Sequence, residues 1–349
     1  MSLGTFTPFG ASAQTLPSTP TNELRLFDLF KQGKALIDAG KYDQAVEIYR
    51  QALSFDGKNA RIFSAVGYIR TQQGAYPDAI AAYRQAIAID PRDANFYYAV
   101  AFCYANMNDY GNAIRHYEQA IQLDPKLLQA YEGLAVINSR QRNFPAALAL
   151  YQKIVSIDPK NANAYRSLGI LALQQQRVPE AIAALQQAAQ FAPKSGDVQI
   201  GLAYAHIAQG NAPAAVAAAN EALRLEPRNA KVNVKAGNIL LSQGSAEAAM
   251  AAYRKATNVD SKLPDGYIGV GDVMRSKGDS IGAIVAYREA LQRQPQSAEA
   301  HYKLGLALQD RNRKDEAIAE FRTARQIYQS QGQSEAVNRV NSALRQLGQ

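Results

Sequence analysis

The chain has 349 residues, of which 47% are hydrophobic and 19% are charged, and its formal net charge is +8. This composition excludes a chain that is disordered throughout. The single cysteine, Cys103, excludes an internal disulfide and any metal cluster built on several cysteines. Polar or charged side chains interrupt every apolar stretch before the roughly 18 residues that a membrane-spanning helix needs, so we do not expect a transmembrane protein.

Residues 1–25 are predicted to form a disordered leader, since the first 22 residues carry no charge and are rich in Ser, Thr and Pro. A secretory signal needs a basic start and an apolar stretch of about 7–15 residues, and Pro8 interrupts such a stretch. The segment "ASAQ" at residues 11–14 is compatible with the remains of a trimmed cleavage site. We therefore expect a cytoplasmic location, with the periplasm or another exported location as the alternative.

Residues 26–331 repeat with a period of 34 without insertion or deletion, and we number the positions of each unit from 1 to 34. Position 8 is Gly or Ala, position 20 is Ala, and position 24 is large in every unit but the sixth. Small side chains at fixed places allow two helices to approach closely. Nine units are predicted, beginning at Leu26, Ala60, Ala94, Leu128, Ala162, Gly196, Ala230, Pro264 and Ala298.

The unit boundaries carry signals that end one helix and begin the next. Proline at position 32 of six units cannot continue a helix. Each unit is therefore predicted to be a helix, a short turn and a second helix. Side chains that can accept the first free N–H groups of the following helix precede most units: Asn59, Asp93, Asn161, Ser195, Asn229 and Ser297.

Residues 332–349 follow the last unit and are predicted to form a capping helix. Apolar side chains recur there at helical spacing along one face, at Val337, Val340, Leu344 and Leu347. Such a face would cover the exposed end of a helical stack.

This pattern resembles the tetratricopeptide repeat (TPR) family, because the small, aromatic and proline positions recur in phase through residues 26–331. The resemblance implies an all-α fold, a right-handed α-α superhelix in which each hairpin buries its apolar face against the next. It also implies a non-catalytic protein-interaction scaffold or assembly factor. Such a protein would bind an extended peptide or a helix of a partner protein in its concave groove, without a cofactor.

Two other roles are left open by the sequence. One is a substrate-recruiting subunit, or a fragment, of an enzyme complex. The other is an exported assembly factor for membrane complexes of photosynthetic bacteria, with weak divalent-metal binding as an additional property. Asp265 and Asp272 lie two helical turns apart on one predicted face, and Asp310 or Glu299 would complete such a metal site.

In the family, positions 2, 5, 6, 9, 12 and 13 of the first helix line the groove. The early part of this groove is aromatic, and we expect these rings to be exposed for a partner, although ordinary packing against neighbouring helices is the alternative. The residues expected to contact a partner are Phe30, Tyr68, Tyr98, Phe102, Arg166, Tyr204, Lys231, Lys235, Asn238 and Asp272.

A clamp of Lys and Asn side chains binds terminal carboxylates in some members of the family. Here the basic residues are present as Arg166, Lys231 and Lys235, but Ile170 and Gly201 stand where the clamp needs amides. We therefore do not expect that clamp, while an acidic or carboxylate-ended segment near the three basic residues stays open.

Position 25 forms a second basic feature on the convex side. An anionic surface is a candidate partner for it, and a solubilising role is the alternative. Nucleic acid is not expected, because the arginines form stripes on the outer surface rather than a groove for phosphates. The stripe consists of Arg50, Arg84, Arg254, Arg288 and Arg322.

No sequence feature predicts catalysis. The three histidines lie in different units, and no phosphate-binding glycine loop, zinc motif or nucleophile elbow occurs. Units six and seven depart from the repeat, with Gln199 and Asn233 at position 4 and Ala219 at position 24. We therefore expect softer packing over residues 196–235.

Overall fold

The computed structural model describes residues 21–349, which form nineteen α-helices and no strand. The chain divides into two larger compact units, Met1–Ala164 and Tyr165–Gln349, and we describe each by itself. From here on, the first and the second unit are these two parts, and the 34-residue units are called repeats. The first unit contains α1 (Thr21–Asp38), α2 (Tyr42–Phe55), α3 (Ala60–Gln72), α4 (Tyr76–Ile89), α5 (Ala94–Asn106), α6 (Tyr110–Leu123), α7 (Leu128–Arg140) and α8 (Phe144–Ile157).

The division between the two units falls inside α9 (Ala162–Gln174). The second unit continues with α10 (Val178–Phe191), α11 (Gly196–Ala208), α12 (Ala212–Leu225), α13 (Ala230–Ser242), α14 (Ala246–Val259), α15 (Pro264–Ser276), α16 (Ser280–Arg293), α17 (Ala298–Asp310), α18 (Lys314–Ser330) and α19 (Ser334–Gln346). The predicted all-α class is therefore confirmed.

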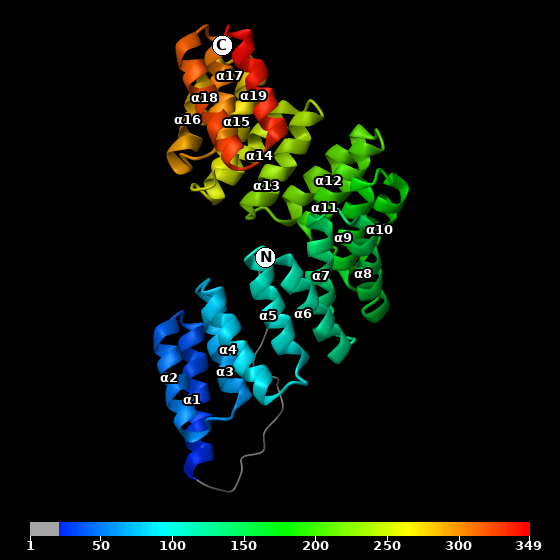
Figure 1. The fold of residues 1–349 in the computed structure, drawn as a ribbon. Helices are drawn as coiled ribbons and strands as arrows, with labels where there is room; N and C mark the ends of the chain where they lie inside the picture. The colour runs from blue at the N-terminus through cyan, green and yellow to red at the C-terminus, as the bar shows by residue number, and fades with distance from the viewer. Residues whose placement is uncertain (1–20) are drawn as a thin grey trace. The chain divides into compact units, whose positions relative to one another are not determined.

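Odd-numbered helices pack in antiparallel hairpins against the even-numbered helix that follows, as in α1–α2 and α13–α14 (Figure 1). The helices α3 to α17 of odd number begin at the residues where the 34-residue frame starts. All six predicted capping side chains accept a backbone N–H in the first turn of the next helix; Asn161 Oδ1, for example, accepts from Ala164 N at 2.9 Å.

The N-terminus differs from the sequence expectation. Residues 1–20 of the expected leader lie outside the described residues, but residues 21–25 belong to α1 instead of being disordered. Glu23 lies in the first turn of α1, where a negative charge favours the helix N-terminus. The first helix therefore begins five residues before the repeat frame.

The large residue at position 24 packs against the small residue at position 8 of its own hairpin and, in several repeats, against a small residue at position 6 of the next. Tyr253 of α14 packs between Gly237 of its own hairpin and Gly269 of the next. A Cβ atom at Gly237 would lie 2.6 Å from Tyr253 Cε1, and one at Gly269 would lie 2.2 Å from the same atom. Leu185 is held in the same way between Gly169 and Gly201. Tyr253 and Leu185 therefore each join two consecutive hairpins.

A methyl group at Gly269 should destabilise the second unit. We expect Gly269→Ala to lower the free energy of unfolding by about 1–3 kcal/mol, because Tyr253 is fully buried and its ring must shift. The matched control is Gly111→Ala in α6, where the nearest atom would lie 4.0 Å away. There the better helix propensity of alanine should stabilise by about 0.5–1 kcal/mol. Urea denaturation of both variants measures the difference, and equal effects would contradict this packing scheme.

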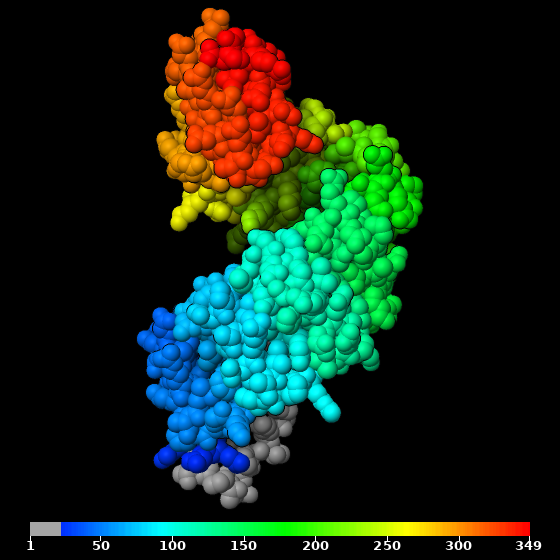
Figure 2. Space-filling model, in the orientation of Figure 1, coloured from blue at the N-terminus to red at the C-terminus, as the bar shows by residue number. Residues whose placement is uncertain are grey.

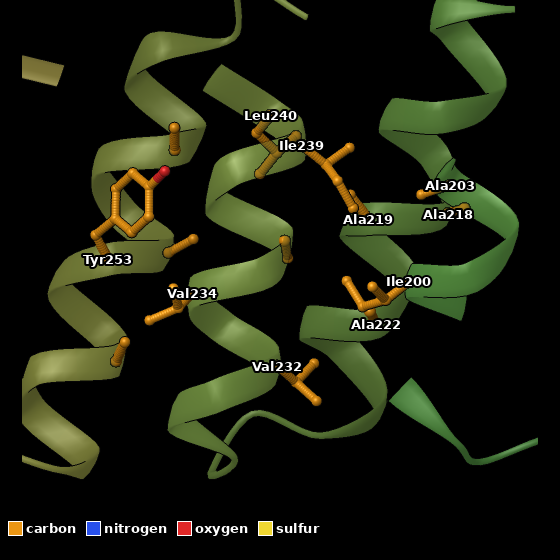
Figure 3. Close-up of a cluster of buried hydrophobic side chains, with 14 of the residues drawn as sticks. Ile200, Ala203, Ala218, Ala219, Ala222, Val232, Val234, Ile239, Leu240 and Tyr253 are labelled. Carbon is orange, nitrogen blue, oxygen red and sulfur yellow. The ribbon is translucent and has the colours of Figure 1, made fainter. Parts of the chain in front are cut away.

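The segment expected to be soft lies within an extensive buried cluster (Figure 3). The alanines of α12, Ala218, Ala219 and Ala222, allow α12 to approach its neighbours closely, and Ile200 and Ile239 contribute the bulk that position 24 lacks there. The expectation of loose packing is therefore not supported by the burial of these side chains.

Position 4 acts as a hydrogen-bond donor across the boundary between repeats. The hydroxyls of Tyr97 and Tyr131 donate to the carbonyl oxygens of Pro91 and Pro125, at 3.2 Å and 3.3 Å. Asn233 Nδ2 makes the equivalent bond to Pro227 O at 3.2 Å. The departure from an aromatic residue at Asn233 therefore preserves the bond but loses the ring, and the buried Oδ1 of Asn233 has no hydrogen-bond partner among the described residues.

The helix α19 covers the end of the second unit. Val340 and Leu344 are buried there, and Val337 and Leu347 are partly buried against the same cluster as α17 and α18. In Figure 2 the red surface of α19 overlies the orange surface of the preceding helices. This is the packing that the apolar spacing of residues 337–347 predicts.

Candidate partner-binding site

The odd-numbered helices form one side of the second unit. Successive odd-numbered helices contact each other from α11 to α17, whereas successive even-numbered helices of this unit are not packed together to this degree. Helices that approach each other more closely lie on the inner side of a curved stack. We call the surface formed by α11, α13, α15 and α17 the inner face.

The inner face contains a cavity of about 410 Å³ across α13, α15 and α17. Ten of its eleven lining residues occupy positions 2, 5, 6, 9, 12 or 13 of their repeats, and the other is Tyr253 at position 24. The ten are Val234, Asn238, Leu241, Ser242, Asp265, Ile268, Gly269, Asp272, Glu299 and Lys303. The lining therefore combines an aliphatic part with carboxylates, an amide and one ammonium group.

Tyrosines of the even-numbered helices hold the polar groups of the cavity in place. Tyr253 donates to Asn238 Oδ1 at 2.7 Å, and Tyr287 donates to Asp272 Oδ1 at 2.7 Å. Tyr328 of α18 donates to Glu299 Oε2 at 2.8 Å. Burial, followed by the charge of Asp272 and the hydrogen bond to it, raises the pKa of Tyr287 well above its usual value, so this hydroxyl remains a donor.

Two lysines of the inner face, Lys303 and Lys235, are already paired with carboxylates of adjacent odd-numbered helices. Lys303 Nζ lies 2.8 Å from Asp272 Oδ2 and 3.5 Å from Glu299 Oε1. Lys235 Nζ lies 2.6 Å from Asp197 Oδ1. The bridges to Asp272 and Asp197 join one repeat to the next, whereas Glu299 lies on the same helix as Lys303. Because the pairs are partly exposed, each contributes about 1 kcal/mol or less.

Family comparisons agree with this architecture. A model described as the cilia and flagella-associated protein 70 C-terminal domain matches residues 59–266, which is more than half of the chain. Models of the tetratricopeptide repeat match residues 33–70, 271–311 and 298–331. The chain belongs to the tetratricopeptide repeat family. No curated protein matches its sequence.

Solved structures show the same TPR fold. Yeast Tom70 has a TM-score of 0.54 at 14% identity, over 93% of this chain and 96% of that one. The Cut9–Hcn1 hetero-tetramer of the APC/C has a TM-score of 0.53 at 18% identity, over 80% and 55%. A tetratricopeptide repeat protein from Parabacteroides merdae has a TM-score of 0.52 at 17% identity, over 82% and 99%. The predicted TPR solenoid class is therefore confirmed.

Within residues 21–349, none of the TPR helices combines the length and the apolar character that crossing a membrane requires.

The aromatic residues predicted for the early TPR groove are less exposed than expected. Phe30 and Tyr68 are half-buried, with the guanidinium of Arg61 lying 5.6 Å from the Phe30 ring centre. Tyr98 and Phe102 are only 6% exposed, so the expectation that they face solvent is wrong. The reason is that α5 is apolar on nearly all sides, and such a helix is buried all round.

The remaining predicted residues all lie in the second unit. Tyr204 is 43% exposed on α11. Burial, followed by the charge of Asp272 and then by the proximity of Tyr204, raises the pKa of Tyr253. Asn238 and Asp272 line the cavity. The three basic residues have different surroundings: Arg166 lies on α9, Lys235 pairs with Asp197, and Lys231 lines a separate cavity at the α12–α13 turn.

Several cavity residues were not among the predicted contacts. Val234, Ile268 and Lys303 occupy the same frame positions as the predicted residues, but the expected contacts emphasised aromatic and charged side chains. The frame itself, applied to every repeat without regard to residue type, would have identified them.

The residues suggested for weak metal binding do not fit a divalent cation. Both oxygens of Asp272 already accept hydrogen bonds, from Tyr287 and Lys303, and Asp310 is held by Arg275 at 2.6 Å. Within residues 21–349 no group of three or more His, Cys, Asp or Glu side chains converges on one point. The metal-binding alternative is therefore not supported by these residues.

The convex arginines are partly neutralised. Arg50 lies 2.6 Å from Glu47, and Arg288 lies 3.7 Å from Glu316. Arg84 donates to the hydroxyl of Tyr104 at 2.9 Å. Binding of an anionic surface to this side stays a prediction.

His301 of α17 should make the stability of the second unit depend on pH. Its Nδ1 lies 2.5 Å from Glu320 Oε2, and its Nε2 lies 3.0 Å from Pro295 O, so the doubly protonated ring donates at both ends. Burial opposes the charged form, but the bonds to Glu320 and Pro295 and the charge of Glu320 outweigh it and raise the pKa above 6.5. The stabilisation is therefore complete below the unfolded pKa and is lost as pH rises through the folded pKa.

Thermal unfolding measured from about pH 5.5 to about pH 9 tests this expectation, with a loss of about 1–2 kcal/mol across the range. Glu320→Gln and His301→Gln should both flatten this part of the profile. Glu335→Gln, on the exposed side of α19, should leave the profile unchanged. If the free energy of unfolding of the wild type rose between pH 6.5 and pH 9 while that of the variants did not, this assignment would be contradicted.

Proposed function

We propose that the protein is a non-catalytic interaction scaffold or assembly factor, and that the inner face of its second unit binds an extended segment or a helix of a partner protein. This proposal rests on one observation, which is that the residues lining the cavity coincide with the family's groove positions although the two sets were identified independently. The residues that line the cavity are those at the frame positions through which the family lines its groove.

The character of the surface supports the same role. An interaction site needs an apolar part that partner side chains can cover and polar groups that fix their orientation. The cavity offers Val234, Leu241 and Ile268 for the first and Asn238 and Asp272 for the second. Exposed Tyr204 adds the kind of large side chain that contributes most to binding energy at interfaces.

Site-specific photo-cross-linking tests the proposal and captures the partner in the same experiment. The photoreactive residue p-benzoyl-phenylalanine replaces Tyr204 on the inner face in one variant and Ile281 in the other. Ile281 lies on α16 and is 60% exposed, which makes it a matched control on the opposite helix layer. In extracts of the native host, we expect discrete adducts from position 204 and none of the same mass from position 281. Adducts from position 281 alone would place the binding surface elsewhere.

The two alternative roles, a recruiting subunit of an enzyme complex and an exported assembly factor, share this surface. The masses of the adducts distinguish them. A catalytic chain cross-linked at a fixed stoichiometry would favour the recruiting subunit, and a membrane-complex subunit would favour the assembly factor.

A further inference from the structure

We propose that the cavity across α13, α15 and α17 accepts a basic side chain, so that the partner segment carries a lysine or arginine next to aliphatic residues. This inference rests on the proposed function, and it specifies the chemistry of the partner. It differs from the alternative left open for Arg166, Lys231 and Lys235, which is an acidic or carboxylate-ended segment.

The first argument is charge. The cavity is lined by three carboxylates, Asp265, Asp272 and Glu299, and by one ammonium group, Lys303. Lys303 lies between Asp272 and Glu299, so its charge is already offset. Asp265 is exposed, and no hydrogen bond or ion pair joins it to another of the described residues. The uncompensated charge of the cavity is therefore negative, which favours a cationic group and disfavours an anionic one.

The second argument is preorganisation. Tyr287 and Tyr328 donate to Asp272 and Glu299 from the even-numbered helices. These carboxylates therefore hold their positions before a partner arrives, and less conformational entropy is lost on binding. The hydroxyl of Tyr253 fixes Asn238 in the same way, with the amide oxygen occupied and the amide nitrogen left to donate.

The third argument is the shape of a basic side chain. Lysine and arginine place an aliphatic stem along apolar surface while the charged head remains among polar groups. Val234 and Ile268 line the cavity together with the carboxylates and offer such an apolar surface. A short acidic side chain has no such stem and would meet the carboxylates directly.

A selection experiment on the full chain tests the inference. The probe is a library of random peptides of about 12 residues, displayed on phage and selected on the immobilised wild-type protein. We expect a lysine or arginine at a fixed position of the selected peptides, flanked by aliphatic residues. Binding of the synthesised consensus peptide should weaken as NaCl rises from about 0.05 M to about 0.5 M. An acidic or purely apolar consensus would overturn the proposal.

Variants of cavity residues then test the preference for a basic side chain separately from the proposed binding surface. Asp265→Lys should weaken consensus binding by at least about tenfold, and Asp265→Asn should weaken it less. The matched control is Asp315→Lys, which changes an exposed aspartate in the first turn of α18, outside the cavity. The control should bind as the wild type does, and circular dichroism shows whether each variant is folded.

Ser242→Trp provides the neutral comparison, because Ser242 lines the cavity and is exposed there. If peptide binding were blocked by Ser242→Trp but unaffected by Asp265→Lys, the proposed function would stand and the preference for a basic side chain would be overturned. Peptides unaffected by both variants would overturn the proposed binding surface as well.

Discussion

Tyr253→Ala should lower the free energy of unfolding of the second unit by about 3–5 kcal/mol, the largest effect expected of a single truncation here. Tyr253 is fully buried, and the glycines on both sides of its ring have no side chains that could fill the resulting cavity. In the sixth repeat, where position 24 is Ala219, isoleucines from adjacent helices contribute bulk, and no such replacement would accompany the substitution at Tyr253.

Two further variants define the origin of this effect. Tyr253→Phe keeps the ring and loses the hydrogen bond to Asn238, so it should be destabilised by only about 1 kcal/mol. Tyr204→Ala removes an exposed tyrosine of the same unit and should change stability by less than about 1 kcal/mol. Urea denaturation gives the ranking, and hydrogen exchange shows which helices open, since repeat arrays need not unfold in a single step. If Tyr253→Ala and Tyr204→Ala were equally stable, the packing role assigned to position 24 would be wrong.

Val340→Asp should release α19 from the end of the second unit. Val340 is fully buried, and a carboxylate there would have no partner, so we expect a loss of at least about 3 kcal/mol. Release would expose apolar side chains of the preceding helices, among them Phe321 and Ile327. Terminal repeats need a polar outer face for solubility, so light scattering should show self-association of the variant.

Asn338→Asp is the control, because it introduces the same side chain on an exposed part of α19. It should remain soluble and keep the amide protection of the wild type in α18 and α19. Protection that is retained in Val340→Asp would mean that α19 does not cover the stack.

The helices and their ends could be predicted from the sequence because both depend on local chemistry. Proline at position 32 stops a helix wherever it occurs, and the capping side chains of Asn59 and Ser297 lie within reach of the N–H groups that they satisfy. The exposure of Tyr98 could not be predicted in this way. The repeat frame gives the direction of a side chain, but burial depends on what the neighbouring helices supply, here the ring of Tyr117 at 5.9 Å.

The candidate site was predictable in its frame positions and not in its charge. Lys235 and Arg275 look like available cations in the sequence, but each is paired with a carboxylate some 35 to 38 residues away, Asp310 for Arg275 and Asp197 for Lys235. Such pairs form between helices at equivalent places in adjacent repeats, so the net charge of the groove emerges only when the repeats are stacked.

The hydrogen bonds from Tyr253 to Asn238 and from Tyr287 to Asp272 have a consequence for how this groove can be altered. Position 9 contacts the core through position 24, so a new specificity introduced at position 9 alone would leave a buried phenol unsatisfied. Asp265 and Ser242 are exposed at the cavity and accept no hydrogen bond from a buried tyrosine, so they can be varied freely. To change the binding specificity of the array, those two residues should therefore be randomised, and positions 9 and 24 should be changed only together.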